Sequence, residues 1–309
     1  MLKKWILVSY ILTVTLYSDT VSFTLENDFF GSKEDNHYTN GVFLVWMRDA
    51  EEESIFNTFL SDMQTNTAVS LSHQMFTPTD KEATEALWDD LPYAGYAKLN
   101  FLLYKSTKNY FHEFGFNLGA IGPITKAEEI QDFFHTVVGD GKFKGWDNQL
   151  GDQWMAGISY QFAYKTDALD WHGLKLDSIS NIRAEAGNYY TGALISTTVR
   201  ISSFTQNSFI TAGSFMVTDE SDLLHLDKVN GFEWDFSAGV FVNGVYNYYI
   251  VDEGIDMGYT IEPMQSTIGW QFALNLMYDS FRYTYKLKSS HVNDQRHKRW
   301  GGMTISWRF

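Results

Sequence analysis

Large apolar residues alternate with small or polar ones along much of this chain. Near the C-terminus the apolar positions are Met303, Ile305, Trp307 and Phe309, and the positions between them are Thr304, Ser306 and Arg308. The same alternation runs through 153–165, 265–278 and 280–288. Successive side chains of a β-strand point to opposite faces, so the pattern predicts strands with one apolar and one polar face. Many such strands suit a transmembrane β-barrel with lipid outside and a polar interior.

The alternating segments predict an all-β, antiparallel barrel of about twelve strands. They lie near residues 20–28, 39–48, 67–76, 93–105, 110–120, 153–165, 180–188, 193–203, 231–243, 265–278, 280–288 and 300–309. The segment 209–217 either adds a hairpin or belongs to a long loop. No linker or shift in composition divides the chain, so we assign residues 19–309 to one barrel domain.

The first residues have the features of a signal peptide. Lys3 and Lys4 precede an apolar run, 5–16, that is too short to span a bilayer as a helix. We therefore assign residues 1–18 to a signal peptide and expect the mature chain to begin near Asp19. An exported barrel belongs in the outer membrane of a Gram-negative bacterium.

Composition adds limits to this picture. Aromatic residues make up 17% of the chain and the mean hydropathy is -0.25, values that a soluble protein could also show. The formal net charge of -15 argues against a nucleic-acid partner. The chain contains 0 Cys, so its stability in an oxidising compartment relies on no disulfide.

The stretch 121–150 departs from the alternating pattern. Its apolar residues recur at offsets of three and four, and they are Ile130, Phe133, Phe134, Val137 and Val138. This spacing predicts a short amphipathic helix over 126–138, inside a loop of a β-protein. His135 lies beside the apolar stripe. One interpretation is a packed histidine on a lid, and the other is a functional histidine.

Strand order assigns each loop to one end of the barrel. Outer-membrane barrels place both termini on the periplasmic side, so connections after odd-numbered strands are extracellular. These include 29–38, 77–92 and the helix-bearing stretch 121–150. The segment 106–109 fits a tight periplasmic turn. The connection 49–66 is long for that side, and the sequence offers no reason for its length.

Polar residues from three segments converge on the extracellular rim. Asn27 and Asp28 end the first strand, Thr39 opens the second, and His135 belongs to the loop helix. A carboxylate with nearby carbonyl oxygens could hold calcium, and an imidazole titrates near neutrality, as a general base requires. A cation and a base suffice to hydrolyse an ester. Each residue alone could serve a strand end, and Asn40 with its following glycine could form a turn, but the convergence favours a site.

The alternation also predicts which way the first strand presents these residues. Its regular continuation turns Asn27 toward lipid and Asp28 toward the lumen. A site at that level would meet lipid substrates from the side. The helix predicted over 126–138 would then cover it.

The motifs in the first half of the chain, taken in order, are those of a known family. They are LENDF at 25–29, HYTNG at 37–41, FTP at 76–78, PYAGY at 92–96, IGP at 121–123, Gln131 with His135, and GWDNQL at 145–150. The set resembles the outer-membrane lipid A 3'-O-deacylases (LpxR-like). The resemblance implies a twelve-stranded barrel that removes the 3'-linked acyloxyacyl chain of lipid A with calcium. It places Asn27, Thr39 and His135 at catalytic positions, with His135 as the base, and Asp28 near the calcium.

The chain departs from that family pattern at several positions. Leu91 follows Asp90 where the family usually has arginine, which removes a cation near the site. Lys144 stands where the family often has proline. Lys81 and Asp140 are loosely aligned candidates for a lysine and an acidic residue that contribute in some members. These differences bear on substrate choice and activity rather than on the fold.

The leading hypothesis is a calcium-dependent deacylase of lipid A or lipopolysaccharide, with the oligomeric state left open. One rival is an outer-membrane phospholipid acyl hydrolase, which would need a serine activated by histidine. Ser70 and Ser72 lie near His73, but in a strand their side chains face away from it. The other rival is a non-catalytic pore or adhesin, which explains the barrel and leaves the loop helix and the rim cluster without a role.

Overall fold

A computed structural model describes residues 19–30, 37–50, 54–138, 141–209, 223, 226–264, 266–292 and 296–309. The predicted signal peptide, residues 1–18, lies outside the described residues. Asp140 and most of the segment 209–217 do so as well.

Antiparallel β-strands make up most of the described chain. They are β1 (Thr20–Asn27), β2 (His37–Asp49), β3 (Gln64–Thr77), β4 (Ala94–Ser106), β5 (Tyr110–Ile121), β6 (Gln153–Lys165), β7 (Leu169–Trp171), β8 (Leu174–Gly187), β9 (Tyr190–Ser202), β10 (Phe232–Tyr248), β11 (Ser266–Tyr278), β12 (Phe281–Val292) and β13 (Arg296–Arg308). Each predicted segment overlaps one of these strands. Only the short β7 was not indicated by the sequence pattern.

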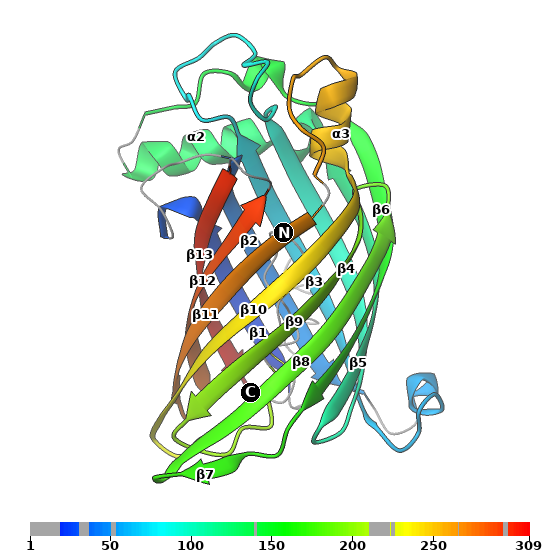
Figure 1. The fold of residues 1–309 in the computed structure, drawn as a ribbon, viewed down its shortest axis with the longest axis vertical. Helices are drawn as coiled ribbons and strands as arrows, with labels where there is room; N and C mark the ends of the chain where they lie inside the picture. The colour runs from blue at the N-terminus through cyan, green and yellow to red at the C-terminus, as the bar shows by residue number, and fades with distance from the viewer. Residues whose placement is uncertain are drawn as a thin grey trace, which may run out of the picture.

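The strands close into a ring (Figure 1). Pairing runs from β6 through β1 and β13 to β8, and β6 also pairs with β8. The strand β7 pairs with β8 and stands outside the ring. The result is an antiparallel closed barrel of 12 strands, which confirms the predicted fold. A closed ring leaves no unpaired strand edge, as a sheet surrounded by lipid requires.

Side-chain burial alternates along the strands as predicted. In β1, Ser22, Thr24 and Glu26 are buried inside the barrel, whereas Phe23 is 45% exposed on the outside. Apolar side chains are stable on the outer face because lipid, and not water, surrounds it. Among the described residues, no helix is long and apolar enough to cross a membrane.

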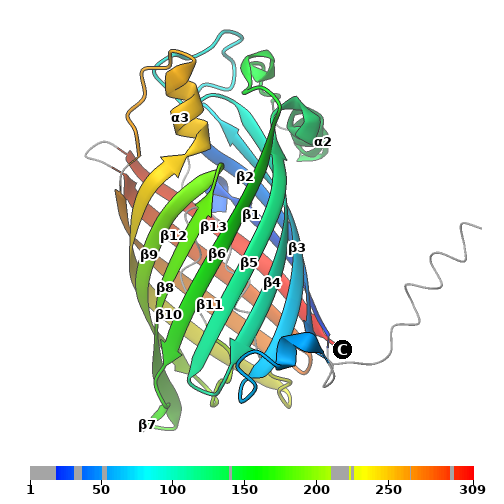
Figure 2. The ribbon, with the colours of Figure 1, turned by 90° about the vertical axis from the view of Figure 1, so that its right-hand side faces the viewer.

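Helices gather at one end of the barrel, here called the upper rim. Figures 1 and 2 show α2 (Ala127–Val138) and α3 (Tyr249–Asp256) at this end, opposite the lower rim, which carries β7 and the C-terminus. Short 3-10 turns are η1 (Asp28–Phe30), η2 (Ile55–Asn57), η3 (Pro123–Thr125) and η4 (Trp146–Asn148). The helix α2 confirms the helix predicted over 126–138. The helix α3 has no counterpart among the sequence predictions.

Apolar side chains fill the lumen near both rims. The upper cluster includes Tyr38, Phe76, Leu91, Tyr96, Tyr248, Ile250, Val251 and Trp300. The lower cluster includes Val45, Met47, Ala68, Leu102, Tyr104, Phe111, Ala163, Ile179, Phe209 and Leu223. Phe209 and Leu223 belong to the connection between β9 and β10, so this connection enters the lower lumen.

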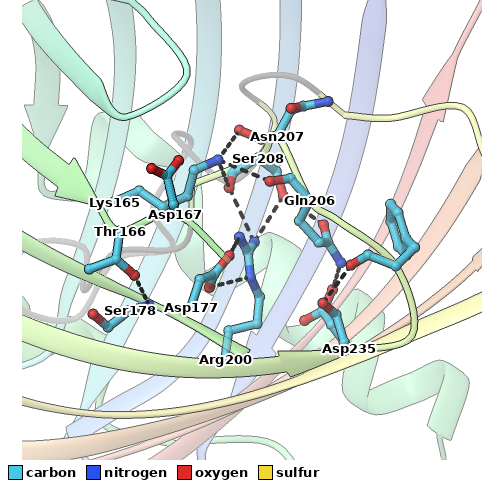
Figure 3. A network of polar contacts seen from close by, with 12 residues as sticks. Lys165, Thr166, Asp167, Asp177, Ser178, Arg200, Gln206, Asn207, Ser208 and Asp235 are labelled. Carbon is cyan, nitrogen blue, oxygen red and sulfur yellow. Dashed lines mark hydrogen bonds and ion pairs between the residues drawn. The ribbon is translucent and has the colours of Figure 1, made fainter. Parts of the chain in front are cut away.

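Buried cations hold the first part of that connection in place, as Figure 3 shows. Lys165 of β6 donates to the carbonyl oxygens of residues 206–208, the shortest contact being 2.7 Å, and its ammonium lies 4.5 Å from the centre of the Phe209 ring. Arg200 of β9 donates to both carboxylate oxygens of Asp177, at 3.0 and 2.6 Å, and to a carbonyl of the same segment at 3.1 Å. These contacts satisfy backbone groups that would otherwise be buried without partners.

Candidate active site at the upper rim

Strands β1 and β2 present polar residues side by side at the upper rim. Asn27, the last residue of β1, is paired in register with Asn40 of β2. It follows Phe23 and Leu25 on the outer face of its strand and is partly exposed. Asp28 begins η1 and is only 3% exposed. The partial exposure of Asn27 agrees with its predicted place on the outer face of β1, whereas Asp28 belongs to η1, outside the strand pattern, so its predicted inward direction stays a prediction.

A β-bulge in β2 places Thr39 beside these residues. Tyr38 and Asn40 pair with consecutive residues of β3, so Thr39 is an extra residue in the register. Its side chain is buried, and its hydroxyl is hydrogen bonded to that of Thr77 at 2.6 Å. Because a bulge redirects the side chains around it, Thr39 is held at the rim next to Asn40.

Tyr38 ties the two site-bearing strands together from inside the barrel. Its hydroxyl donates to Glu26 Oε2 at 2.7 Å, and its ring packs 5.5 Å from Phe76 and 6.5 Å from Trp300 between centroids. Gly41 makes room for this contact, since a Cβ at that position would clash with the Tyr38 hydroxyl. The ends of β1 and β2 are therefore fixed relative to each other.

The oxygen atoms at this rim suit a hard cation. Asp28 offers a carboxylate, and Asn27 and Asn40 offer amide oxygens. Asn40 Oδ1 is buried and accepts no hydrogen bond from the part of the chain that is described, so its lone pairs are available to a ligand. Calcium prefers carboxylate and carbonyl oxygens, which this set provides. Within the described ranges, no group of three or more His, Cys, Asp or Glu could hold a metal ion, so a cation here would depend on the amides beside Asp28.

The helix α2 packs against the outside of the barrel next to these strand ends. Its first turns belong to an apolar cluster made of Met75, Tyr93, Ala127, Phe143 and Trp146, against which Ile130 packs. Met75 alternates with Phe76, which belongs to the lumen cluster, so Met75 lies on the outer face of β3. Trp146 Nε1 donates to Gln131 Oε1 at 2.7 Å and joins the helix to η4.

The residues just before α2 lie equally close to the wall. Gly95 of β4 permits this approach, because a Cβ there would clash with Thr125 and Ala127. His73, on the outer face of β3, has its Nε2 3.0 Å from the Thr125 carbonyl oxygen. His73 is therefore a contact of the helix-bearing loop, although it lies inside a strand as predicted.

His135 lies on the packed face of α2, four residues after Gln131 and eight after Ala127. Its Nδ1 is 2.6 Å from the Gly141 carbonyl oxygen, and its ring meets Phe143 edge-on at 5.4 Å. A carbonyl oxygen can only accept, so Nδ1 carries the proton in this contact and Nε2 is the basic nitrogen of the neutral ring. The loop thus sets both the tautomer and the orientation of the imidazole.

The positions that depart from the family pattern have partners of their own. Leu91 is 2% exposed in the upper lumen cluster, so an apolar residue packs where the pattern has a cation. The carboxylate of Asp90 accepts from the Thr79 backbone and hydroxyl at 2.8 and 2.7 Å. Lys144 forms an exposed ion pair with Glu82 at 2.7 Å, and this carboxylate raises the pKa of Lys144. These contacts join the loop 77–92 to the loop that carries α2.

The chain was compared with known families and structures. It matches the model of the family described as "Outer membrane protein LpxR" over residues 6–309. Among solved structures, LpxR from Salmonella typhimurium is similar with 16% identity and a TM-score of 0.76, over 94% of this chain and 100% of that chain. The β domain of the Bordetella autotransporter BrkA shares 7% identity with a TM-score of 0.49, over 94% of this chain and 98% of that one. No curated protein matched the sequence.

The two informative comparisons agree with the geometry in different ways. The similarity to the Salmonella structure shows the fold, because its identity is too low to show more. The family match spans nearly the whole chain, including every residue of the rim described above. The chain therefore belongs to the LpxR family of outer-membrane lipid A 3'-O-deacylases, which are ester hydrolases.

Proposed function

We propose that this chain releases the 3'-linked acyloxyacyl group of lipid A by calcium-dependent ester hydrolysis, with His135 as the general base. The termini of outer-membrane barrels are periplasmic, so the upper rim faces the outer leaflet, where lipid A resides. The observation that supports the proposal most is that candidate site residues at the upper rim lie on the outer face of the barrel wall. Asn27 and Asn40 belong to the lipid side of β1 and β2, and α2 packs on the same side of β3. A lipid could reach this side without entering the lumen.

His135 supplies the proton transfer in this proposal. Its Nε2 takes a proton from the attacking water, while the Gly141 carbonyl retains the proton on Nδ1. The same contact orients the ring as a third group does in hydrolases that pair a nucleophile with a base. A positioned base of this kind contributes about 10²- to 10⁴-fold to the rate.

Asp28 would supply a carboxylate ligand for calcium, and Asn27 and Asn40, which are paired in register beside it, would supply amide oxygens. When bound there, the cation would polarise the ester carbonyl and stabilise the negative charge that develops on its oxygen. The side-chain N–H groups of Asn27 can donate to the same oxygen from the lipid side. Thr39, held by Thr77, keeps a hydroxyl next to Asn40 and can donate to the ester or to the attacking water.

The rival based on a serine nucleophile has no support in the geometry of β3. Ser70 and Ser72 are fully buried on the lumen face, whereas His73 contacts Thr125 on the outer face. The strand places the two residue types on opposite sides of the wall.

Mass spectrometry of lipid A from cells that express the protein tests the proposal. The wild type should remove the mass of one acyloxyacyl group, and a His135→Asn variant present at equal level in the outer membrane should leave lipid A intact. Unmodified lipid A in the wild-type cells, at millimolar calcium and with folded protein, would overturn the substrate assignment. Release of free fatty acid from phospholipids alone would favour the rival hydrolase.

A further inference from the structure

The long connection between β2 and β3 is an ordered structure at the lower rim. Residues 54–63, here called the lower-rim turn, begin with Ser54, whose Oγ accepts from Phe56 N at 3.3 Å and caps η2. The Thr58 hydroxyl donates to the Ile55 carbonyl at 2.6 Å, and Met63 N donates to the Leu60 carbonyl at 3.0 Å. Hydrogen bonds of its own therefore give this turn a defined shape.

This turn carries large apolar side chains that the protein leaves uncovered. Ile55 is 77% exposed, Phe56 44%, Phe59 51% and Leu60 40%. They recur at offsets of one, four and five, which gathers them on one side of the turn. Reversing the chain at a barrel end needs only a short polar segment, so four exposed apolar residues between Ile55 and Leu60 indicate a contact surface.

The lower-rim turn stands beside the barrel wall. Figures 1 and 2 show η2 outside the ring of strands, at the height of the lower strand ends. The ring of Phe59 meets that of Phe114 at 5.6 Å, edge to face, and Phe114 lies on the outer face of β5, 5.2 Å from Tyr160 of β6. Phe114 and Tyr160 belong to the aromatic surface that faces lipid, so the turn continues that surface.

A buried lysine attaches the turn to the wall. Lys105 of β4 is 0% exposed, and its ammonium donates to the Phe56 carbonyl at 3.1 Å and to the Thr65 hydroxyl at 2.7 Å. In β4 it alternates with Tyr104, which belongs to the lumen cluster, so Lys105 lies on the outer face. The turn thereby covers a cation and a hydroxyl that would otherwise face lipid, where an unpaired cation is costly.

We propose that the lower-rim turn inserts into the periplasmic leaflet, and that Ile55, Phe56, Phe59 and Leu60 contact phospholipid acyl chains there. Its polar residues Ser61 and Asp62 then lie at headgroup level. The partner is the lipid itself, because the apolar side of the turn is continuous with the lipid-facing belt through Phe59 and Phe114. A second copy of the chain would have to cover the same side, and the experiment below separates the two.

Site-directed spin labelling tests this placement, since the chain has 0 Cys and a single introduced cysteine gives a unique label. Ile55→Cys is the primary site because that side chain is the most exposed of the four. Phe116→Cys on the outer face of β5 is the lipid-facing control, and Lys108→Cys in the neighbouring turn between β4 and β5, whose side chain is exposed, is the water-facing control. Each labelled protein is placed in phosphatidylethanolamine and phosphatidylglycerol vesicles, and collision with oxygen and with a water-soluble nickel chelate is measured.

The label at Ile55 should give an oxygen-to-nickel collision ratio close to that at Phe116 and several-fold above that at Lys108. A ratio equal to that at Lys108 would overturn the proposal. Spin–spin broadening at Ile55 that disappears on dilution with unlabelled protein would assign the surface to a second copy instead. Retention of heat-modifiable electrophoretic mobility confirms that each variant is folded. None of these readouts depends on deacylase activity, so they remain valid whatever the catalytic test shows.

Discussion

Replacing His135 by asparagine separates the loss of the base from the loss of the loop contact. The structure assigns the two ring nitrogens different tasks, because Nδ1 donates to the Gly141 carbonyl and Nε2 is left as the basic nitrogen. In the His135→Asn variant the side-chain amide can still donate to Gly141, but it has no basic nitrogen that could accept a proton. In His135→Ala both functions are lost.

The expected magnitudes follow from these tasks. Loss of a general base lowers kcat by about 10²- to 10⁴-fold, which corresponds to about 2.7–5.5 kcal/mol in the activation barrier. The hydrogen bond to Gly141 contributes about 0.5–1.5 kcal/mol, and it stabilises a loop on the outside of the barrel rather than strand pairing. Both variants should therefore lose at least about a hundredfold in kcat, while the barrel unfolds at the wild-type temperature.

The assay is the initial rate of acyl release from lipid A in detergent micelles at saturating calcium. His112→Asn is the matched control, because His112 lies on the outer face of β5 with its Nδ1 2.8 Å from the Tyr160 hydroxyl, away from the upper rim. His73 is unsuitable as a control, since it contacts the loop that carries α2. A folded His135→Asn variant with more than about a third of the wild-type kcat, or a His112→Asn variant impaired as strongly, would refute the assignment.

Three further predictions concern the cation and the framework. Chelation by EGTA should abolish deacylation, and activity that survives chelation would contradict the metal assignment. Asp28→Asn should raise the half-activating calcium concentration by about tenfold or more, because fewer charged ligands weaken a calcium site. Tyr38→Phe should lower kcat without unfolding the barrel, since it removes only the hydroxyl that ties β2 to Glu26; unchanged kinetics would show that the strand ends keep their positions without it. Arg200→Met should lower the free energy of unfolding of the barrel in urea by about 3–5 kcal/mol, because Asp177 loses its buried partner. Adding Asp177→Leu should restore part of that loss. Equal stabilities of the single and double variants would argue against the ion pair as the cause.

Periodicity explains why most of the fold could be predicted. Each strand has one face in lipid and one in the lumen, so its apolar residues recur with a period of two. The helix α2 is recognisable because three helical turns with a different period interrupt this pattern. The helix α3 escapes the same reasoning, since its eight residues follow directly on the long strand β10. Two turns are too few to establish a helical period beside a strand pattern.

The positions of candidate site residues at strand ends could be predicted from the sequence, whereas positions that depend on the pairing register between strands could not. Asn27 and Asp28 follow an alternating segment, so their rim position can be read from the chain. The bulge at Thr39 depends on how β2 pairs with β3, and single-sequence periodicity carries no such information. Asn40 suggested turn chemistry for the same reason, although it lies inside β2 opposite Asn27. Leu91 suggested a missing cation, whereas its packing with lumen side chains explains its apolar character.

The apolar side chains inside the lumen bear on the rival hypothesis that the barrel is a pore. Near the lower rim, Phe209 is packed among lumen-facing side chains of six strands and is held by Lys165. Near the upper rim, Ile250 and Val251 of α3 pack among Tyr38, Tyr248 and Trp300. A conducting pore needs a continuous polar path, and apolar clusters occupy part of the lumen near both ends of the described barrel.

The apolar clusters in the lumen also favour the outer face as the place of the proposed catalysis. Lipid A carries several acyl chains that stay in the leaflet, and passing them between strands would break a hydrogen-bonded wall in a medium that cannot replace those bonds. A site formed by Asn27, Asn40 and Thr39 needs no such passage, because only the sugar and the ester must rise to the rim. The closed ring then serves to hold β1 and β2 rigid, so that the ligands and the helix-borne base keep their relative positions while lipid moves past them.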